Sequence, residues 1–300
     1  MRAKHQKGVC TLLFSMYSGF FALVRKYGIE QAAKTAAALG FSSVELFDKA
    51  GKESFSPTLP NVQAAARARE VLHQHGLSVS CYSVATTLVA PDSTLQKNAK
   101  AIDELKAYAD MTAALGAPYL HHTLVLKMPL PADAPRFDEI LEPVAEAAAE
   151  VAHYCEGLGL TCLYEDQGMY FNGVENFGRF FAEMQKRCPN VGVCGDMGNT
   201  LFVDESPVPF FRAFAPHIKH VHVKDYRMIV DQQSNTASLC SKGGTLLKDT
   251  VIGQGEIDIP GCLQILREHN YKGAFALEDP FCENYADSVR AAFSLVEKHF

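Results

Sequence analysis

Four residues that can bind a metal stand at the ends of four short apolar runs. They are Glu165 in LTCLYED, Asp196 in VGVCGDMGN, His222 in KHVHVKD and Glu278 in AFALEDP. Two glutamates, an aspartate and an imidazole suit a divalent ion such as Mn²⁺, Mg²⁺, Co²⁺ or Zn²⁺. In a barrel of parallel strands the carboxyl ends converge on one face, so residues far apart in the sequence can meet around one ion.

The alternation within each run places these residues on one side of its strand. Glu278 shares a face with Ala274 and Ala276, and His222 shares a face with His220, whereas bulkier apolar residues occupy the opposite faces. Small side chains suit the crowded interior of a barrel, and bulky ones suit the side that meets helices. The polarity of loops would explain any one of the acidic residues, but it explains less well why each falls on the inward face.

The elements that must position these residues alternate between strand and helix along the chain. This alternation predicts a parallel sheet, and eight units in 300 residues fit a single closed (β/α)₈ TIM barrel over residues 1–300. No GxGxxG follows the first strand, which argues against dinucleotide binding. The expected strands are 9–14, 42–47, 77–84, 118–126, 160–165, 191–196, 218–223 and 273–278. The expected helices are 28–39, 61–75, 94–115, 138–157, 174–187, 207–214, 260–269 and 284–298.

The composition is that of an ordinary soluble globular protein. It is 48% hydrophobic and 21% charged, and its net charge is −6 without a Lys/Arg-rich run, which argues against nucleic acid as a partner. The nine cysteines contain no CxxC spacing and predict small buried side chains in a reducing cytoplasm, with Cys194 on the inward face as a candidate lining residue. Homo-oligomerisation stays open.

The N-terminus resembles a signal peptide in one respect, because the basic segment MRAKHQKG precedes an apolar stretch. No small-residue cleavage site follows, and the stretch is too short and too mixed for a membrane span. We expect the first barrel strand here, running into a loop. A second long segment, the excursion at 225–256, follows the strand that carries His222 and is expected to fold over the site, since long loops at this face of a barrel are usually functional.

Other polar residues are candidates for contacts with a substrate. His121 and His122 end the fourth strand, and one of them must point inward; His122 is slightly favoured. Lys224 shares the parity of His222 and lies at the strand mouth, so it is a candidate substrate contact. Glu45 is a candidate carboxylate of the pocket or the barrel interior. Asp225 is as good a candidate for capping a loop as for contacting a substrate.

Several phrases of the chain together resemble those of a known family. They are GFSSVEL, GAPYL, YEDQG, GDMGN, HVHVKD, GQGEIDIPG and the final ALE, and they span most of the chain. The chain is similar to the xylose isomerase-like barrel superfamily, and within it to the sugar phosphate isomerase/epimerase group that includes D-tagatose 3-epimerase and inosose dehydratase. The HxHxKD phrase and GQGEID, with the ligand-bearing strand ends in order, are the specific part of this resemblance.

The resemblance implies that Glu165, Asp196, His222 and Glu278 bind one catalytic divalent metal, with Mn²⁺ expected, and that the two glutamates also act as base and acid. The epimerase pattern has a histidine three residues after the aspartate ligand, where this chain has Asn199.

The same pattern has an arginine six residues after the histidine ligand. This chain has Met228 there, and the neighbouring Arg227 is a candidate substitute. The residues expected to contact a substrate are His122, Asn199, Lys224 and Arg227.

The chemistry expected of this set is removal of a proton next to a carbonyl through an enediolate. The first hypothesis is an isomerase or epimerase of a small sugar or keto-sugar. The alternative is a lyase acting on a keto-inositol or a 3-keto sugar, because the same ligands serve elimination equally well. An apurinic endonuclease is disfavoured by Asn199 and by the acidic charge, and a non-catalytic sugar-binding barrel is disfavoured by the complete ligand set.

Overall fold

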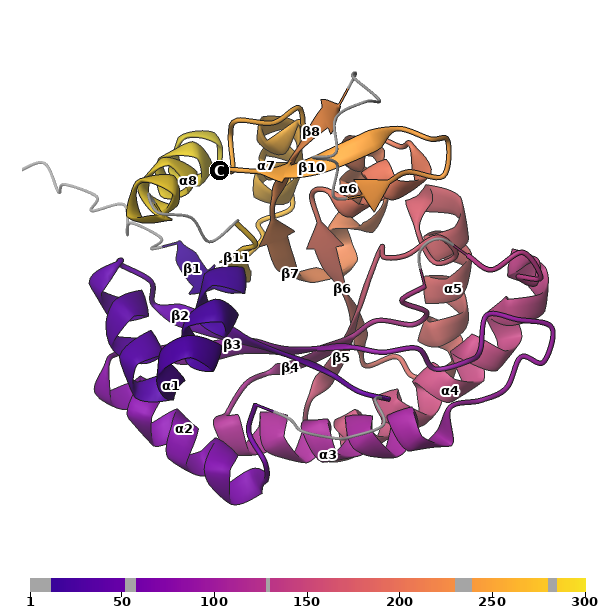
Figure 1. The fold of residues 1–300 in the computed structure, drawn as a ribbon, viewed down its shortest axis with the longest axis horizontal. Helices are drawn as coiled ribbons and strands as arrows, with labels where there is room; N and C mark the ends of the chain where they lie inside the picture. The colour runs from indigo at the N-terminus through magenta and orange to yellow at the C-terminus, as the bar shows by residue number, and fades with distance from the viewer. Residues whose placement is uncertain (1–11, 52–57, 128–129, 230–238, 280–284) are drawn as a thin grey trace, which may run out of the picture.

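Eight parallel strands close into a barrel that helices surround (Figure 1). The structure is a computed structural model that describes residues 12–51, 58–127, 130–229, 239–279 and 285–300. The strand order around the barrel is β1-β11-β7-β6-β5-β4-β3-β2. The barrel strands are β1 (Leu13–Met16), β2 (Ser43–Lys49), β3 (Ser78–Ala85), β4 (Tyr119–His122), β5 (Thr161–Glu165), β6 (Val191–Asp196), β7 (Ile218–Val223) and β11 (Ala274–Leu277).

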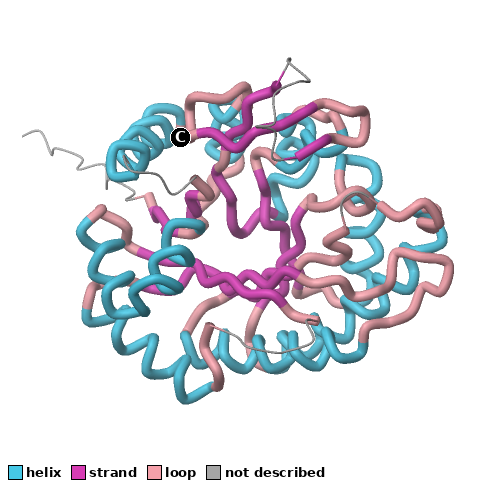
Figure 2. Tube along the Cα trace, viewed as in Figure 1, coloured by secondary structure: helices cyan, strands magenta, loops and turns pink. Residues whose placement is uncertain are grey.

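The helices form the outer layer of the molecule, as Figure 2 shows by colour. They are α1 (Ser18–Ala38), α2 (Val62–Gln74), α3 (Ala99–Leu115), α4 (Phe137–Gly157), α5 (Gly173–Arg187), α6 (Pro207–Phe214), α7 (Ile259–Glu268) and α8 (Tyr285–His299), with the 3₁₀ turns η1 (Asn199–Val203) and η2 (Ala215–His217). The predicted (β/α)₈ barrel is therefore confirmed. No helix of the described residues is long and apolar enough to cross a membrane.

The helix ends follow local signals in the sequence. Asn61 caps α2 by accepting a hydrogen bond from the Ala64 backbone N–H at 2.9 Å, as expected for a short side-chain oxygen at this position. Asn98 does the same for α3. Gly116 ends α3 in the left-handed conformation at φ 73°, which a glycine adopts without steric cost.

Two helices begin elsewhere than the sequence predicts. The structure has α1 from Ser18, where a loop is expected, and residue Gly28 with φ 80° and ψ 168° interrupts it. The predicted helix 28–39 is thus only the second half of α1. α3 begins five residues later than expected, because the Asn98 cap comes after the turn at Asp92, whose carboxylate accepts from the Thr94 backbone N–H.

The core lies mainly between the barrel strands and the helices. A large cluster of buried apolar residues fills this layer, and Phe177, Phe180 and Phe210 are among its largest members. A small separate cluster, made of Cys81, Leu163 and Cys194, is formed by residues that face the barrel interior. Cys194 is fully buried there, in agreement with the expected inward face of β6.

The described part of the excursion after β7 forms a second, small sheet. Its strands are β8 (Asp225–Ile229), β9 (Leu239–Cys240) and β10 (Leu246–Thr250), paired antiparallel in the order β8-β10-β9. Asp204 at the end of η1 holds this sheet, because its carboxylate accepts from Ser241 Oγ at 2.5 Å and from Thr245 Oγ1 at 3.0 Å. Figure 1 shows the sheet on the side of α6 and α7. Residues 230–238 of the predicted excursion lie outside the described residues, as does the first half of the predicted strand 9–14.

Candidate active site

Four neighbouring barrel strands bring the four predicted ligands together. Glu165 is the last residue of β5, Asp196 is the last residue of β6, His222 is the penultimate residue of β7, and Glu278 directly follows β11. These strands are consecutive in the barrel, in the order β5-β6-β7-β11. Because they run parallel, the four side chains lie at the same end of the barrel, the end where active sites of this architecture occur.

The imidazole of His222 is the centre of this arrangement. Its Nδ1 lies 2.8 Å from Glu165 Oε1, 3.6 Å from Asp196 Oδ2 and 3.9 Å from Glu278 Oε2. Ligand atoms of Asp196, His222 and Glu278 all lie within 4.8 Å of one another. Atoms that share one ion at about 2.1 Å are themselves separated by about 3–3.5 Å. The spacing around His222 is close to this value.

Lys224 enters the same group of carboxylates from the residue that follows β7. Its ammonium lies 2.9 Å from Asp196 Oδ2 and 2.9 Å from Glu278 Oε2, and it donates to Asn199 Oδ1 at 3.1 Å. A Cβ at Gly198 would lie only 2.7 Å from Lys224 Cγ and Cδ. Gly198, the second glycine of GDMGN, therefore leaves the space through which the buried side chain of Lys224 reaches the carboxylates.

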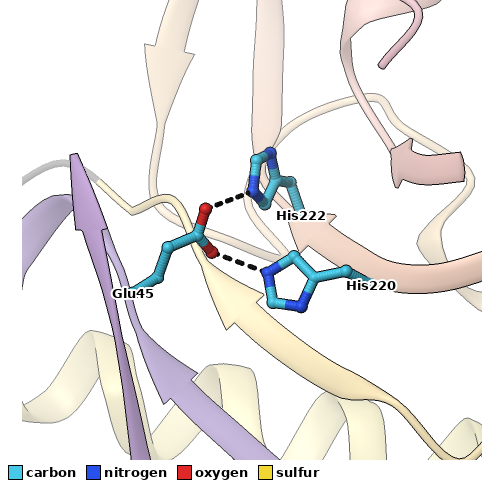
Figure 3. Close-up of side chains that lie close together, drawn as sticks. All are labelled: Glu45, His220 and His222. Carbon is cyan, nitrogen blue, oxygen red and sulfur yellow. Dashed lines mark hydrogen bonds and ion pairs between the residues drawn. The ribbon is translucent and has the colours of Figure 1, made fainter. Parts of the chain in front are cut away.

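A hydrogen-bonded group inside the barrel lies against the other side of His222 (Figure 3). Glu45 of β2 accepts from His220 Nε2 at 2.6 Å through Oε2 and contacts His222 Nε2 at 3.0 Å through Oε1. The Ser83 hydroxyl of β3 donates to Glu45 Oε1 at 2.5 Å. Glu45 and His220 are fully buried. His220 thus partners a carboxylate in the barrel interior.

The two histidines of β4 point to opposite sides, and the one that faces the site is His121. His121 Nδ1 lies 2.9 Å from Ser83 Oγ, and its Nε2 lies 3.6 Å from Glu165 Oε2. The ring of His122 packs edge-on against Tyr164, whose hydroxyl donates to a carbonyl of α4 at 3.4 Å. The structure therefore turns His122 toward the helix layer, contrary to the sequence-based preference, because strand alternation gives the inward position to its neighbour.

The other predicted substrate contacts divide into one that reaches the site and one that does not. Asn199 is fully buried beside Lys224, and its Nδ2 donor has no hydrogen-bond partner among the described residues. Arg227 is exposed on β8 and donates to the Gln254 carbonyl at 2.9 Å. Met228 next to it is 41% exposed. The structure does not bring Arg227 to the four ligands.

Burial and neighbouring charges shift the proton affinities of the site. Burial raises the pKa of Glu165 to about 7, against the opposing effect of His222. Burial also works to raise the pKa of Asp196, but Lys224 and His222 outweigh it and hold that pKa below its ordinary value. Burial raises the pKa of Glu278, with Lys224 opposing. Two carboxylates of one site therefore hold their protons more strongly than usual, and the third holds its proton less strongly.

The donor set fits a divalent cation. Three carboxylates and an imidazole nitrogen are ligands that Mg²⁺, Mn²⁺ and Zn²⁺ all accept. Asp196 Oδ2 is buried and accepts no well-directed hydrogen bond from the described residues, although the Lys224 ammonium lies 2.9 Å away. A buried carboxylate oxygen of this kind is suited to a positive ion.

Two residues of the site, Ser83 and Tyr17, are missing from the sequence-based candidates, and Glu45 is predicted only as a carboxylate of the pocket or the barrel interior. Glu45, Ser83 and Tyr17 all touch the histidines: Tyr17, which precedes α1, stacks on His222 with ring centroids 4.7 Å apart. The sequence signal for Glu45 and Ser83 is that alternation places both on the inward faces of neighbouring strands. In the structure, the register of β2 and β3 pairs Glu45 with Cys81 and Phe47 with Ser83. Tyr17 carried no comparable signal because the sequence predicts a loop there.

The sequence model of the family described as xylose isomerase-like TIM barrel matches residues 33–297 of this chain. The chain belongs to the xylose isomerase-like TIM barrel family. Among relatives, an inosose dehydratase of Clostridium botulinum is 37% identical over 93 residues, which cover 30% of this chain and 31% of that protein. This match thus spans less than a third of the relative's length.

Two solved structures have the same fold as the chain. The D-allulose 3-epimerase from Methylomonas sp. in complex with D-allulose has a TM-score of 0.70 at 17% identity, and the match covers 96% of this chain and 97% of the epimerase. The IOLI protein with a binding zinc atom has a TM-score of 0.72 at 14% identity, with 96% and 99% of the two chains covered. At these identities the likeness establishes the barrel fold.

Proposed function

We propose that this protein is a divalent-metal-dependent isomerase or epimerase of a small sugar or keto-sugar. The observation that carries the proposal is the convergence of Glu165, Asp196, Glu278 and His222 Nδ1 at the carboxyl ends of four consecutive barrel strands. The structural likeness to an epimerase in complex with D-allulose supports a sugar as the substrate class.

Glu165, Asp196, His222 and Glu278 would hold the metal, with Mn²⁺ as the proposed ion and Mg²⁺, Co²⁺ or Zn²⁺ as alternatives. When bound, such an ion polarises a substrate carbonyl and stabilises the negative charge that develops on its oxygen. The donor set supports this proposal, and so does the zinc atom of the structurally similar IOLI protein.

The two glutamates are the proposed acid and base. They stand on the two outer strands of the ligand set, β5 and β11, with β6 and β7 between them. A carboxylate on each flank can remove a proton from one face of a substrate carbon and return it to the other face or to the neighbouring carbon.

A series of aromatic rings extends from His222 and supports a carbohydrate as the ligand. Tyr17 stacks on His222, Phe47 lies edge-on to Tyr17 at 6.1 Å between centroids, and Phe21 lies edge-on to Phe47 at 5.2 Å. Binding sites combine such apolar surfaces with a few placed polar groups. We propose that the unpartnered amide Nδ2 of Asn199 and the ammonium of Lys224 are these polar groups.

A second candidate is a metal-dependent lyase that eliminates water from a keto-inositol or a related 3-keto sugar. The observation that favours it is the local identity of 37% with an inosose dehydratase. The first half of the reaction is the same in both candidates, because elimination and epimerisation both begin by removal of a proton next to a carbonyl.

Proton NMR in D₂O tests both candidates in one experiment. A panel of ketoses, keto-inositols and 3-keto sugars is incubated with protein that has been stripped of metal and reloaded with Mn²⁺, Mg²⁺, Co²⁺ or Zn²⁺; the Mn²⁺ and Co²⁺ samples are freed of metal and protein before the spectra are recorded. An isomerase or epimerase gives a new sugar with deuterium at the α-carbon, whereas a lyase gives an unsaturated or dicarbonyl product. Turnover of a substrate with neither result would contradict the proposal.

Glutamine variants at the two glutamates test the assigned roles. Glu165→Gln and Glu278→Gln each keep one oxygen for the metal but remove the base, so turnover should fall roughly 10²–10⁴-fold while bound metal is retained. Glu104→Gln in α3 is the matched control, because this buried glutamate accepts from the Gly51 backbone N–H and belongs to no metal-binding group of the described residues. Wild-type rates in either active-site variant would contradict the roles.

A further inference from the structure

The carboxylate of Glu45 reaches across the interior of the barrel to the strand that carries the central histidine of the site. Glu45 belongs to β2, and two strands, β1 and β11, lie between β2 and β7. Even so, its Oε1 lies 3.0 Å from His222 Nε2, and neither side chain is more than 1% exposed (Figure 3). Burying a charged group this deeply costs free energy unless its partners compensate the charge. The position of Glu45 beside His222 therefore indicates a function beyond packing.

Both oxygens of Glu45 are held in position by other residues. Ser83 donates to Oε1 at 2.5 Å, and His220 Nε2 donates to Oε2 at 2.6 Å. These donors come from β3 and β7, so the carboxylate is fixed from two sides of the barrel. Oε1 therefore presents a fixed acceptor to His222 Nε2.

This contact decides which nitrogen of His222 carries the proton in the neutral ring. A neutral imidazole has one N–H, and the acceptor that faces one nitrogen selects the tautomer. With the proton on Nε2 and donated to Glu45, the lone pair of Nδ1 faces Glu165, Asp196 and Glu278. If the proton sat on Nδ1, it would be donated to Glu165 Oε1 at 2.8 Å, and the ligand atom would be blocked.

We infer that Glu45 is a positioning residue that holds His222 with Nδ1 free for a divalent cation. This inference rests on the proposed metal site and deepens it. A carboxylate behind a metal-binding histidine fixes the ring and raises its basicity, and loss of such a partner typically costs 10–100-fold in metal affinity.

The same carboxylate orients a second histidine through Ser83. Because the Ser83 hydroxyl donates to Glu45, its oxygen accepts from His121 Nδ1 at 2.9 Å. This leaves Nε2 of neutral His121 without a proton, 3.6 Å from Glu165 Oε2. Glu45 thereby determines which ring nitrogen carries no proton in both histidines that face Glu165, His121 and His222.

Isothermal titration with Co²⁺ and Mn²⁺ compares the wild type with Glu45→Gln. We expect Glu45→Gln to bind each ion about 10–100-fold more weakly, whereas the control Glu104→Gln binds as the wild type does. Glu45→Asp separates positioning from charge balance, because it keeps the negative charge but withdraws the oxygens by one methylene. Positioning predicts that Glu45→Asp also binds weakly; wild-type affinity in Glu45→Gln or full recovery in Glu45→Asp would overturn the inference.

A measurement on the wild type keeps the inference testable if the variants do not fold. In the Co²⁺-loaded protein, the Nε2 proton of His222 should give a hyperfine-shifted NMR signal that exchanges slowly with D₂O, because it is buried and donated to Glu45. Absence of this signal, or rapid exchange, would overturn the inference while leaving the metal site in place. Wild-type protein that binds neither ion would overturn the proposed function itself, and the inference with it.

Discussion

At the scale of single residues, the candidate site is a balance of buried charges. Three carboxylates and Glu45 converge on His222, and Lys224 is the cation that lies between Asp196 and Glu278. The side chain of Lys224 is 7% exposed and that of Asp196 is fully buried. Such a lysine is held by its counter-ions, and the carboxylates in turn depend on it as long as no other cation is bound.

Replacing Lys224 by methionine tests this balance. Lys224→Met should lower the free energy of unfolding of the metal-free protein by roughly 3 kcal/mol, the lower end for breaking a buried ion pair, because the Glu278 side chain is 32% exposed. Added Mn²⁺ should stabilise the variant more than the wild type, because the ammonium no longer competes for the same two oxygens. Urea unfolding with and without Mn²⁺ measures both effects, and equal stabilisation of the two proteins would contradict this account.

His122 makes a separate prediction about stability and pH. Burial lowers the pKa of His122 to about 4, with its hydrogen bond to the Thr123 carbonyl opposing. The unfolded chain takes up this proton near pH 6.5, so the stabilising effect of keeping His122 neutral is present above that pH and is lost as the pH falls toward 4.

Between pH 7.5 and 5.0 this linkage amounts to about 2 kcal/mol. His122→Phe keeps a ring against Tyr164 and removes the titrating group. Between pH 7.5 and 5.0, the free energy of unfolding of this variant should therefore fall by about 2 kcal/mol less than that of the wild type. Urea titrations at the two pH values measure the difference. The control is His153→Phe, at an exposed position in α4, which should follow the wild type; parallel pH profiles of His122→Phe and the wild type would refute the prediction.

The residues that the sequence could predict are those whose neighbours fix their direction. Asp196 and His222 lie at the last and the penultimate position of strands of six residues with clear alternation, so their inward face follows from the pattern alone. His121 and His122 close a strand of four residues with apolar residues of both parities, and the pattern does not choose between them. The long reach of Glu45 to His222 depends on barrel closure, which no local pattern contains.

At the scale of elements, two phrases of the sequence meet in the structure. Asp225, at the end of HVHVKD, accepts hydrogen bonds from three backbone N–H groups of GQGEID. They belong to Gly253 at 3.0 Å, Gly255 at 2.8 Å and Ile257 at 3.2 Å. It also accepts from Tyr226 at 2.9 Å. Asp225 therefore anchors the connection from β10 to α7 at the start of β8, and the structure supports the loop-capping alternative for this residue.

Asp225→Asn tests this anchor, because an amide nitrogen would replace one acceptor that faces two N–H groups. Leaving buried donors unsatisfied costs about 1–3 kcal/mol each, so we expect a loss of roughly 2 kcal/mol in stability. Hydrogen exchange should become faster at the amides of Gly253, Gly255 and Ile257. Asp249→Asn, at an exposed position on β10, is the matched control, and unchanged exchange in Asp225→Asn would show that other contacts hold the connection.

The small sheet shows what element-level patterns could not provide. The sequence predicts one long excursion over 225–256 and assigns no strand within it, yet its described part contains β8, β9 and β10. β9 has two residues, and β10 reads LLKDT without alternation, so neither carries a strand signal of its own. Their pairing depends on contacts with the end of η1, where the Asp204 carboxylate accepts hydrogen bonds from Ser241, Gly243 and Thr245.

At the scale of the whole molecule, the barrel was predictable because eight strand–helix units repeat along the chain. Strands 191–196 and 218–223 coincide with β6 and β7. The predicted first strand and first helix differ from the structure, because the apolar stretch after Met16 continues as α1 up to Gly28. An apolar run alone does not distinguish a strand from a buried helix.

The last prediction concerns the barrel as one cooperative unit. A metal held by Glu165, Asp196, His222 and Glu278 would join four consecutive strands, so binding should stabilise the whole fold. At a free metal concentration of 100 times the dissociation constant, the expected gain in unfolding free energy is about 2.7 kcal/mol.

Removal of the metal by EDTA should reverse this gain and lower the melting temperature. Asp196→Ala should purify without metal and show no response to Mn²⁺ or EDTA, whereas Asp249→Ala should respond as the wild type does. Calorimetry and metal analysis on the same samples measure both properties. Metal content at the wild-type level in Asp196→Ala would contradict the assigned ligands, and a melting temperature independent of metal in the wild type would show that the ion does not join the strands.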